Sequence, residues 1–165
     1  IKHHNVWMSD IFNLDNSLQM IHELGIITQK EIKANEIINL IKDSFQKINQ
    51  LKKSVLYLIW NKPYMAAGQN TFINDMLKRC GLINVLKQPE SRYPELSIDE
   101  MIELNPELIF LSSEPYPFKE QHIIELKEKL PHTKMILVDG ELFSWYGSRL
   151  LKSASYFNQL STLIS

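Results

Sequence analysis

The sequence is short of cysteine, of long apolar runs and of any excess of one charge, and each shortage narrows what the chain can be. A single cysteine, Cys80, excludes an internal disulfide. No apolar run approaches the ~20 residues that a membrane-spanning helix needs. The 18 Lys and Arg residues balance the 19 Asp and Glu residues. The net charge of -1 therefore gives no electrostatic reason to bind nucleic acid or an anionic membrane.

The composition is that of a folded globular protein. Apolar residues make up 44% and charged residues 22% of the 165 residues. This length suffices for one sizeable core, or for one domain with a fragment of another. The first residue is Ile, not Met, and no export signal follows it. We therefore expect a truncated piece of a longer protein.

Continuous apolar segments of strand length alternate with amphipathic helical segments along the chain. This alternation predicts an α/β fold with a doubly wound, mainly parallel sheet. The predicted strands are 5–8, 54–60 (SVLYLIW), 83–86, 108–111 (LIFL) and 135–138 (MILV).

The N-terminal third predicts two helices. Leu14, Leu18, Ile21 and Leu24 recur at helical spacing, and Gly25 follows as the expected stop. A capping-box pattern, with Thr28 three residues before Glu31, begins the second helix. Its apolar stripe continues to residue 51, which predicts one long helix over 28–53.

A ligand site is expected where parallel strands end. In an open α/β sheet, ligands bind at the carboxyl ends of the strands, which selects the loops 60–70, 112–118 and 139–148. These loops and the segment around residue 93 are rich in aromatic residues, which form either a ligand surface or plugs at the end of the core. The predicted ligand-binding residues are Trp60, Tyr64, Arg92, Tyr93, Ser112, Glu114, Trp145, Tyr146 and Arg149.

Motifs for catalysis are scarce. The sequence has no G-x-G-x-x-G, P-loop or G-x-S-x-G motif, and none of its five histidines shows zinc-site spacing. Asp139 and Glu141 could serve as an acid–base pair beside Arg149, which keeps a small hydrolase or transferase as an alternative. The sequence favours binding over catalysis, with no catalytic residue, metal or cofactor expected.

Several segments together resemble a known family. They are 60–77 (WNKPYMAAGQNTFINDML), 80–85 (CGLINV), 92–100 (RYPELSIDE), 105–113 (NPELIFLSS) and 139–149 (DGELFSWYGSR). This pattern resembles the C-terminal lobe of ABC-transporter substrate-binding proteins of the cobalamin and iron-chelate class. The resemblance extends over roughly residues 6–160.

The resemblance implies a division of the chain and a function. Residues 1–27 would end a truncated N-terminal lobe, 28–53 would be the inter-lobe backbone helix, and 54–165 would be the C-terminal α/β lobe. The implied ligand is cobalamin or a ferric chelate, held in the cleft between the lobes. The implied location is periplasmic or at the cell surface, and a ligand sensor without transport stays open as a further alternative.

Two smaller sites are also implied by the resemblance. Tyr93 occupies the place of the aromatic residue that packs on the corrin in cobalamin binders. Asp99, with Glu100 next to it, occupies the place of the acid that forms a salt bridge with arginines of the membrane permease. The implied partners are an ABC permease with its ATPase and a small-molecule ligand, with no nucleic acid and no direct membrane contact.

Overall fold

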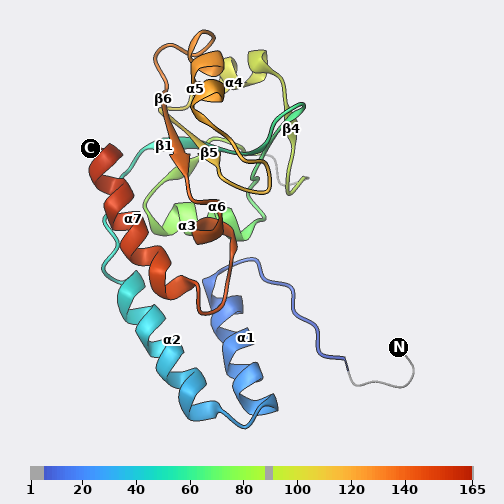
Figure 1. The fold of residues 1–165 in the computed structure, drawn as a ribbon, viewed down its shortest axis with the longest axis vertical. Helices are drawn as coiled ribbons and strands as arrows, with labels where there is room; N and C mark the ends of the chain where they lie inside the picture. Colours follow the sequence, from blue (N-terminus) through green and yellow to red (C-terminus); the bar gives the residue numbers. More distant parts are fainter. Residues whose placement is uncertain (1–5, 88–90, 165) are drawn as a thin grey trace.

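The computed structural model describes residues 6–87 and 91–164. Helices and strands alternate along most of the chain, as Figure 1 shows. The described helices are α1 (Leu14–Ile27), α2 (Glu31–Phe45), α3 (Phe72–Arg79), α4 (Ile98–Leu104), α5 (Glu120–Lys127), α6 (Gly140–Ser144) and α7 (Leu150–Ile164). The described strands are β1 (Ser54–Trp60), β2 (Tyr64–Ala66), β3 (Ile83–Asn84), β4 (Glu95–Leu96), β5 (Leu108–Ser112) and β6 (Lys134–Val138).

One mixed sheet forms the centre of the α/β part. Its strand order is β4-β2-β1-β5-β6, and β3 pairs with the first residues of β1. Strands β1, β5 and β6 run parallel, whereas β2 and β4 are antiparallel to their neighbours. The predicted fold class, a mainly parallel sheet wound by helices, is therefore confirmed.

The sheet buries a separate hydrophobic cluster on each face. Alternate residues of β1 point to opposite sides, with Tyr57 in one cluster and Leu56 and Leu58 in the other. The Tyr57 side is covered by α3, α6 and α7, and the Leu56 side by α4 and α5 (Figure 1). Burial on both faces explains why β1 and β5 read as continuous apolar runs.

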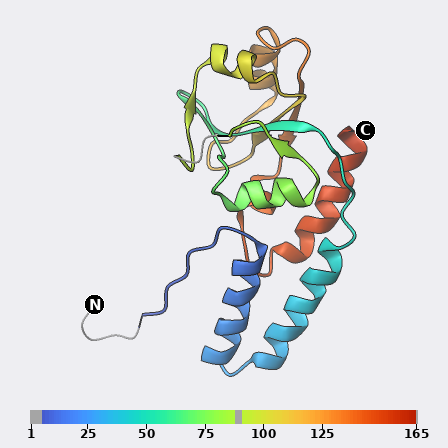
Figure 2. The ribbon, with the colours of Figure 1, turned by 180° about the vertical axis from the view of Figure 1, so that it is seen from behind.

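Helices α1 and α2 form an antiparallel hairpin that extends away from the sheet (Figures 1 and 2). Gly25, predicted as the stop of the first helix, instead lies inside α1. A Cβ at Gly25 would lie 2.6 Å from the Cβ of Ala34 on α2. The glycine therefore permits a close approach of the two helices, and the prediction of a C-terminal stop was wrong.

The predicted capping box at Thr28 is also wrong. The Thr28 hydroxyl donates a hydrogen bond to the Leu24 carbonyl at 2.6 Å, so the residue closes α1 rather than opening α2. Lys30 stands at the N-cap of α2 and makes no side-chain capping bond. A threonine between two helices can bond either the last carbonyls of the first helix or the first N–H groups of the second. Here its hydroxyl bonds a carbonyl at the end of α1.

Exchanging one methyl group between the two helices tests the close approach. An alanine at a helix interior is normally about 1 kcal/mol more favourable than glycine, yet we expect G25A to lower the free energy of unfolding by about 1–3 kcal/mol because its methyl collides with Ala34. The double variant G25A/A34G moves the methyl to the other helix and should recover most of this loss. Urea unfolding measures both; a stabilised G25A would contradict the packing argument.

The second helix is shorter than predicted. It ends at Phe45, and residues 48–53 are irregular. Hydrogen bonds from elsewhere in the fold hold this segment in place of helical ones: Asn49 N–H donates to the Asn158 side chain of α7 at 2.8 Å, and Leu51 N–H donates to the Cys80 carbonyl at 2.9 Å. Ile48 is still buried, so apolar residues recur at helical spacing in the sequence beyond the residue at which the helix ends.

Three further local predictions differ from the structure. Residues 6–8 of the predicted N-terminal strand have no regular structure, and Asn5 lies outside the described residues. The loop predicted after Trp60 contains the short strand β2, and the loop 139–148 contains the helix α6. Elements of three to five residues are too short to show a period in the sequence.

Candidate functional site

The carboxyl ends of β1, β5 and β6 lie at one edge of the sheet because these strands are parallel and in register. The following loops are joined there by hydrogen bonds. Tyr116 N–H donates to the Ile59 carbonyl at 3.3 Å, and Gly140 N–H donates to the Ser113 hydroxyl at 2.9 Å. The three predicted loops therefore meet at the predicted edge.

Trp60 and Tyr64 lie on the β1–β2 side of this edge. The Trp60 side chain is 39% exposed, and its ring meets that of Tyr116 edge-on with centroids 5.7 Å apart. Tyr64 is half-buried, and burial is the main cause that raises the pKa of its phenol. Tyr116 was not among the predicted ligand-binding residues.

Trp145, Tyr146 and Arg149 lie on the β6 side. Trp145 is 52% exposed, and the Arg149 guanidinium lies 5.8 Å from the centre of its ring. The same guanidinium forms an ion pair with Glu141. Tyr146 is also exposed, and its ring contacts that of Phe72 at the start of α3 at 5.8 Å.

Ser112 lies beneath this surface, and Glu114 is half-buried next to it. Ser112 is buried; its hydroxyl accepts a hydrogen bond from the Tyr57 phenol at 3.2 Å and donates one to the Glu114 carbonyl at 2.6 Å. The Glu114 carboxylate accepts a hydrogen bond from the Ser144 hydroxyl at 2.9 Å. Both residues thus connect the loop after β5 to neighbouring segments. Burial strongly raises the pKa of the Tyr57 phenol.

Arg92 and Tyr93 lie near the loop after β2. The Gly68 N–H donates to the Arg92 carbonyl at 2.8 Å, and a Cβ at Gly68 would lie 2.6 Å from the Ser91 carbonyl oxygen. The Arg92 guanidinium lies 4.6 Å from the centre of the Phe12 ring, and Tyr93 is 39% exposed. Phe12 is therefore a neighbour of the predicted site that the sequence did not indicate.

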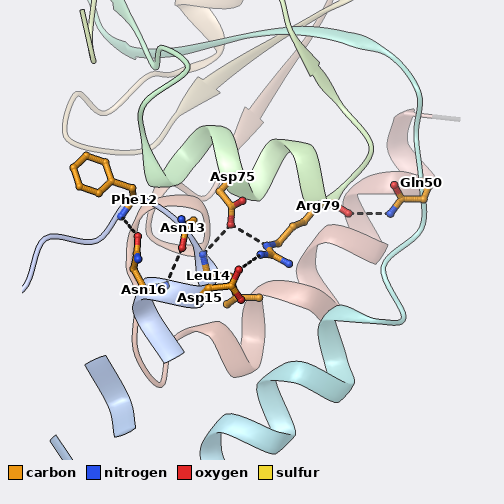
Figure 3. A network of polar contacts seen from close by, with 8 residues as sticks. All are labelled: Phe12, Asn13, Leu14, Asp15, Asn16, Gln50, Asp75 and Arg79. Atoms are coloured by element: carbon orange, nitrogen blue, oxygen red, sulfur yellow. Dashed lines mark hydrogen bonds and ion pairs between the residues drawn. The ribbon is translucent and has the colours of Figure 1, made fainter. Parts of the chain in front are cut away.

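The segment that carries Phe12 is held by a polar network (Figure 3). The Asp75 carboxylate of α3 accepts hydrogen bonds from Leu14 N–H at 2.8 Å and from Arg79 Nε at 2.9 Å. Arg79 also lies 3.9 Å from Asp15 at the start of α1. These contacts fix the start of α1 against α3. A groove of about 480 Å³ opens beside them, between Phe12, Arg92 and the start of α3.

The residues of the enzyme alternative have other partners. The Asp139 carboxylate accepts a hydrogen bond from Glu141 N–H at 3.0 Å and caps α6, while Glu141 pairs with Arg149. Within residues 6–87 and 91–164, no group of three or more His, Cys, Asp or Glu side chains is placed to hold a metal ion. This arrangement favours positioning of the loop over acid–base chemistry.

Together these side chains make a surface suited to a flat, partly anionic molecule. We name the aromatic residues and the half-buried arginine that follow the parallel strands the rim: Trp60, Trp145, Tyr146 and Arg149. Arg92 and Tyr93 lie before β4, opposite the loop after β2. Aromatic faces and edges bury large area at low entropic cost, and guanidinium groups bind carboxylates in a bidentate geometry. The geometry therefore supports binding of an intact solute.

The two predicted docking acids lie elsewhere, at the start of α4. Glu100 completes a capping box, since its carboxylate accepts hydrogen bonds from the backbone N–H and the hydroxyl of Ser97 at 2.7 and 2.8 Å. Both bonds lower the pKa of Glu100, and the bond from the Ser97 backbone N–H has the larger effect. Asp99 is exposed at the second position of the helix.

Comparison with known proteins was made by sequence and by fold. The family model described as periplasmic binding protein matches residues 4–130. No curated protein matches the sequence. Among the described residues, none of the helices has the length and apolar character needed to cross a membrane.

Solved structures share the fold over nearly the whole chain. A possible iron-binding (periplasmic solute-binding) protein from Staphylococcus epidermidis is 22% identical with a TM-score of 0.76, over 95% of this chain and 64% of that chain. The periplasmic vitamin B12 binding protein of Vibrio cholerae is 13% identical with a TM-score of 0.72, over 99% and 67%. The periplasmic heme-binding protein BhuT is 13% identical with a TM-score of 0.77, over 94% and 65%. The chain thus spans about two thirds of the length of these structures.

Proposed function

The chain belongs to the periplasmic binding protein family, and from this we propose that it is part of the substrate-binding component of an ABC importer. In this proposal residues 54–165 are the C-terminal lobe, and the hairpin of α1 and α2 leads to the other lobe. The protein acts outside the cytoplasmic membrane, in the periplasm or at the cell surface. It captures a solute and passes it on unchanged.

The proposed ligand is cobalamin or a ferric chelate. The observation that carries this proposal is the rim, in which three aromatic side chains and one guanidinium group lie at the ends of the parallel strands. A corrin, a porphyrin or a ferric chelate offers a broad face for the rings and peripheral carboxylate or amide groups for the arginine. Proteins of the same fold are named for vitamin B12, for heme and for Fe3+-hydroxamate.

A titration of the complete protein that contains this chain tests the proposal. Vitamin B12, hemin and a ferric hydroxamate are added in turn while tryptophan fluorescence is recorded, because Trp60 and Trp145 lie on the rim. Saturable quenching by one of the three probes is the expected result. Quenching by none of them would contradict the proposed ligand class.

The proposed partner is an ABC permease with its ATPase, and Asp99 is the proposed docking acid. Both residues are exposed, but the Glu100 carboxylate is occupied by the cap at Ser97, to which Asp99 does not belong. An exposed carboxylate at the start of a helix suits a basic socket, because complementary charge steers association. Of the two acids predicted together, the geometry favours the first.

Charge reversal at Asp99 is expected to block delivery without affecting capture. In vesicles that hold the permease and its ATPase, D99K should lower ligand uptake at least about tenfold, as expected when a like charge faces a basic socket. Its affinity for the ligand should stay unchanged because Asp99 is not one of the rim residues. E103K, on an exposed position of the same helix, is the control. Equal losses in both variants would refute a specific docking role for Asp99.

Acid should weaken the start of α4 through Glu100. Its pKa is lowered in the folded chain, so its stabilising effect is complete above the ordinary value of 4.5 and is lost as the pH falls below that value through the lowered pKa. We expect E100Q to show a smaller loss of stability than the native chain between pH 5 and pH 3 (about the range over which carboxylates titrate). Urea unfolding measures this, with E103Q as the control. Parallel curves for E100Q and the native chain would argue against the cap.

A further inference from the structure

Behind the rim lies a buried polar network that the proposed ligand contacts do not use. Asn61 and His122 are only 6% and 4% exposed. Asn61 Nδ2 lies 3.3 Å from the Tyr116 phenol oxygen, and His122 Nε2 lies 3.0 Å from the same oxygen. Two buried polar side chains from distant parts of the sequence therefore meet on one hydroxyl. Such groups are costly to bury unless their hydrogen bonds are made.

The contacts of His122 determine where its ring carries the proton. Lys119 N–H donates to His122 Nδ1 at 2.9 Å, whereas the alternative contact of Nδ1 with the Lys119 carbonyl is longer, at 3.3 Å. With Nδ1 as the acceptor, the neutral ring is protonated on Nε2 and donates to the Tyr116 oxygen. One half of the imidazole thus holds the start of α5, and the other half holds the phenol.

The phenol is in turn attached to two consecutive residues at the end of β1. Trp60 meets the Tyr116 ring edge-on at 5.7 Å, and Asn61 bonds the Tyr116 oxygen. Asn61 Oδ1 is buried without a hydrogen-bond partner among the described residues. A half-turn of this amide would let Oδ1 accept the Tyr116 proton. Whatever orients Tyr116 therefore also orients Trp60.

We propose that His122 is a positioning residue for the rim: it holds Tyr116 by its hydroxyl, and Tyr116 holds Trp60 in the orientation that receives the ligand. Phe118 limits the movement of the Tyr116 ring further, because the two ring centroids lie 4.9 Å apart. The hydrogen bond to the hydroxyl then fixes how the ring faces Trp60. The placement of Trp60 follows from these contacts alone. Its effect on affinity rests on the function proposed above.

The two halves of the imidazole can be removed separately. In H122N the shorter amide keeps an acceptor near the Nδ1 position for Lys119 N–H but does not reach Tyr116. In H122Q the longer amide keeps a donor near the Nε2 position but gives up the bond to Lys119. Y116F removes the hydroxyl and leaves the ring. Y156F is the matched control, because the Tyr156 hydroxyl bonds Asp139 N–H at 2.8 Å and its ring packs in the cluster on the other face of the sheet.

The readout is the 19F NMR signal of Trp60 in the complete protein labelled with 5-fluorotryptophan, identified by its loss in W60F. Without ligand, H122N and Y116F should move this signal toward that of free 5-fluorotryptophan and increase its solvent isotope shift, whereas H122Q and Y156F should leave it in place. Y116F gives the result if H122N does not fold. An unmoved signal in Y116F, or a shift in H122Q as large as in H122N, would overturn the proposal.

Affinity supplies the second readout. For whichever of vitamin B12, hemin and a ferric hydroxamate the native protein binds, H122N and Y116F should raise Kd about three- to tenfold, because an unsupported side chain must be ordered on binding. H122Q should keep the native Kd. A moved signal with an unchanged Kd would overturn the effect on the ligand. Failure of the native protein to bind any probe would instead refute the proposed ligand class, and the 19F result would stand.

Discussion

Replacing Phe143 with alanine is expected to lower the free energy of unfolding by about 3–5 kcal/mol. The Phe143 side chain is fully buried, and its ring contacts those of Phe157 and Tyr57 with centroids 4.7 and 5.2 Å away. Removing it leaves a cavity between α6, α7 and β1 that these rigid rings cannot fill. Thermal unfolding should show a fall of about 10 °C, since each kcal/mol is worth about 2–4 °C in a domain of this size.

The matched control for this prediction is I124A on α5. Ile124 is exposed, so its truncation should change the free energy of unfolding by no more than about 0.5 kcal/mol. A loss below about 1 kcal/mol in F143A would show that the ring cluster is not the main support of this side of the sheet. Phe143 lies two residues before Trp145 in the chain, so F143A should also disturb the β6 side of the rim.

Replacing Trp60 with alanine is expected to weaken ligand binding by about 30-fold. Large aromatic anchors at a binding surface typically contribute 2 kcal/mol or more, and about 1.4 kcal/mol corresponds to a factor of ten. W145A should have an effect of similar size. Trp60 lies on the β1 side and Trp145 on the β6 side of the rim, so the two losses should be close to additive in the double variant. Calorimetry with the probe that quenches the native protein measures each Kd.

Trp7 provides a control of the same residue type. It is as exposed as Trp60, but its indole N–H donates to Glu23 on α1 at 3.1 Å, away from the strand ends. W7A should therefore leave Kd unchanged. If W7A and W60A weaken binding equally, the loss reflects a general effect of removing tryptophan, and the rim is not the ligand surface.

The central sheet could be predicted well because its middle strands, β1 and β5, are buried on both faces. Continuous apolar runs at β1, β5 and β6 alternate with helices, and that pattern admits few arrangements other than a parallel sheet. The end of α2 could not be predicted. It depends on Asn158, more than 100 residues further along the chain. The Asn158 side chain accepts the hydrogen bond of Asn49 N–H that a longer helix would have made within itself.

The candidate site was predicted in its location but not in its connections. Strand polarity brings Trp60 and Trp145 to one edge, and both are exposed there. Burial of Ser112 and the contact of Phe12 with Arg92 depend on packing between segments far apart in sequence, for which the sequence contains no local signal. For the contact of Tyr116 with Trp60, the sequence offered one indication, which is that Tyr116 lies in the aromatic loop after β5.

The two halves of the rim pack on separate hydrophobic clusters, one on each face of the sheet. Trp145 and Tyr146 follow α6, which packs into the cluster containing Tyr57, whereas Trp60 leans on Tyr116, which packs against the cluster containing Leu56. Substitutions in one cluster can therefore reshape one half of the rim while the other half keeps its form. In the proposed function, such a layout would let solute preference change stepwise, one half of the strand-end surface at a time.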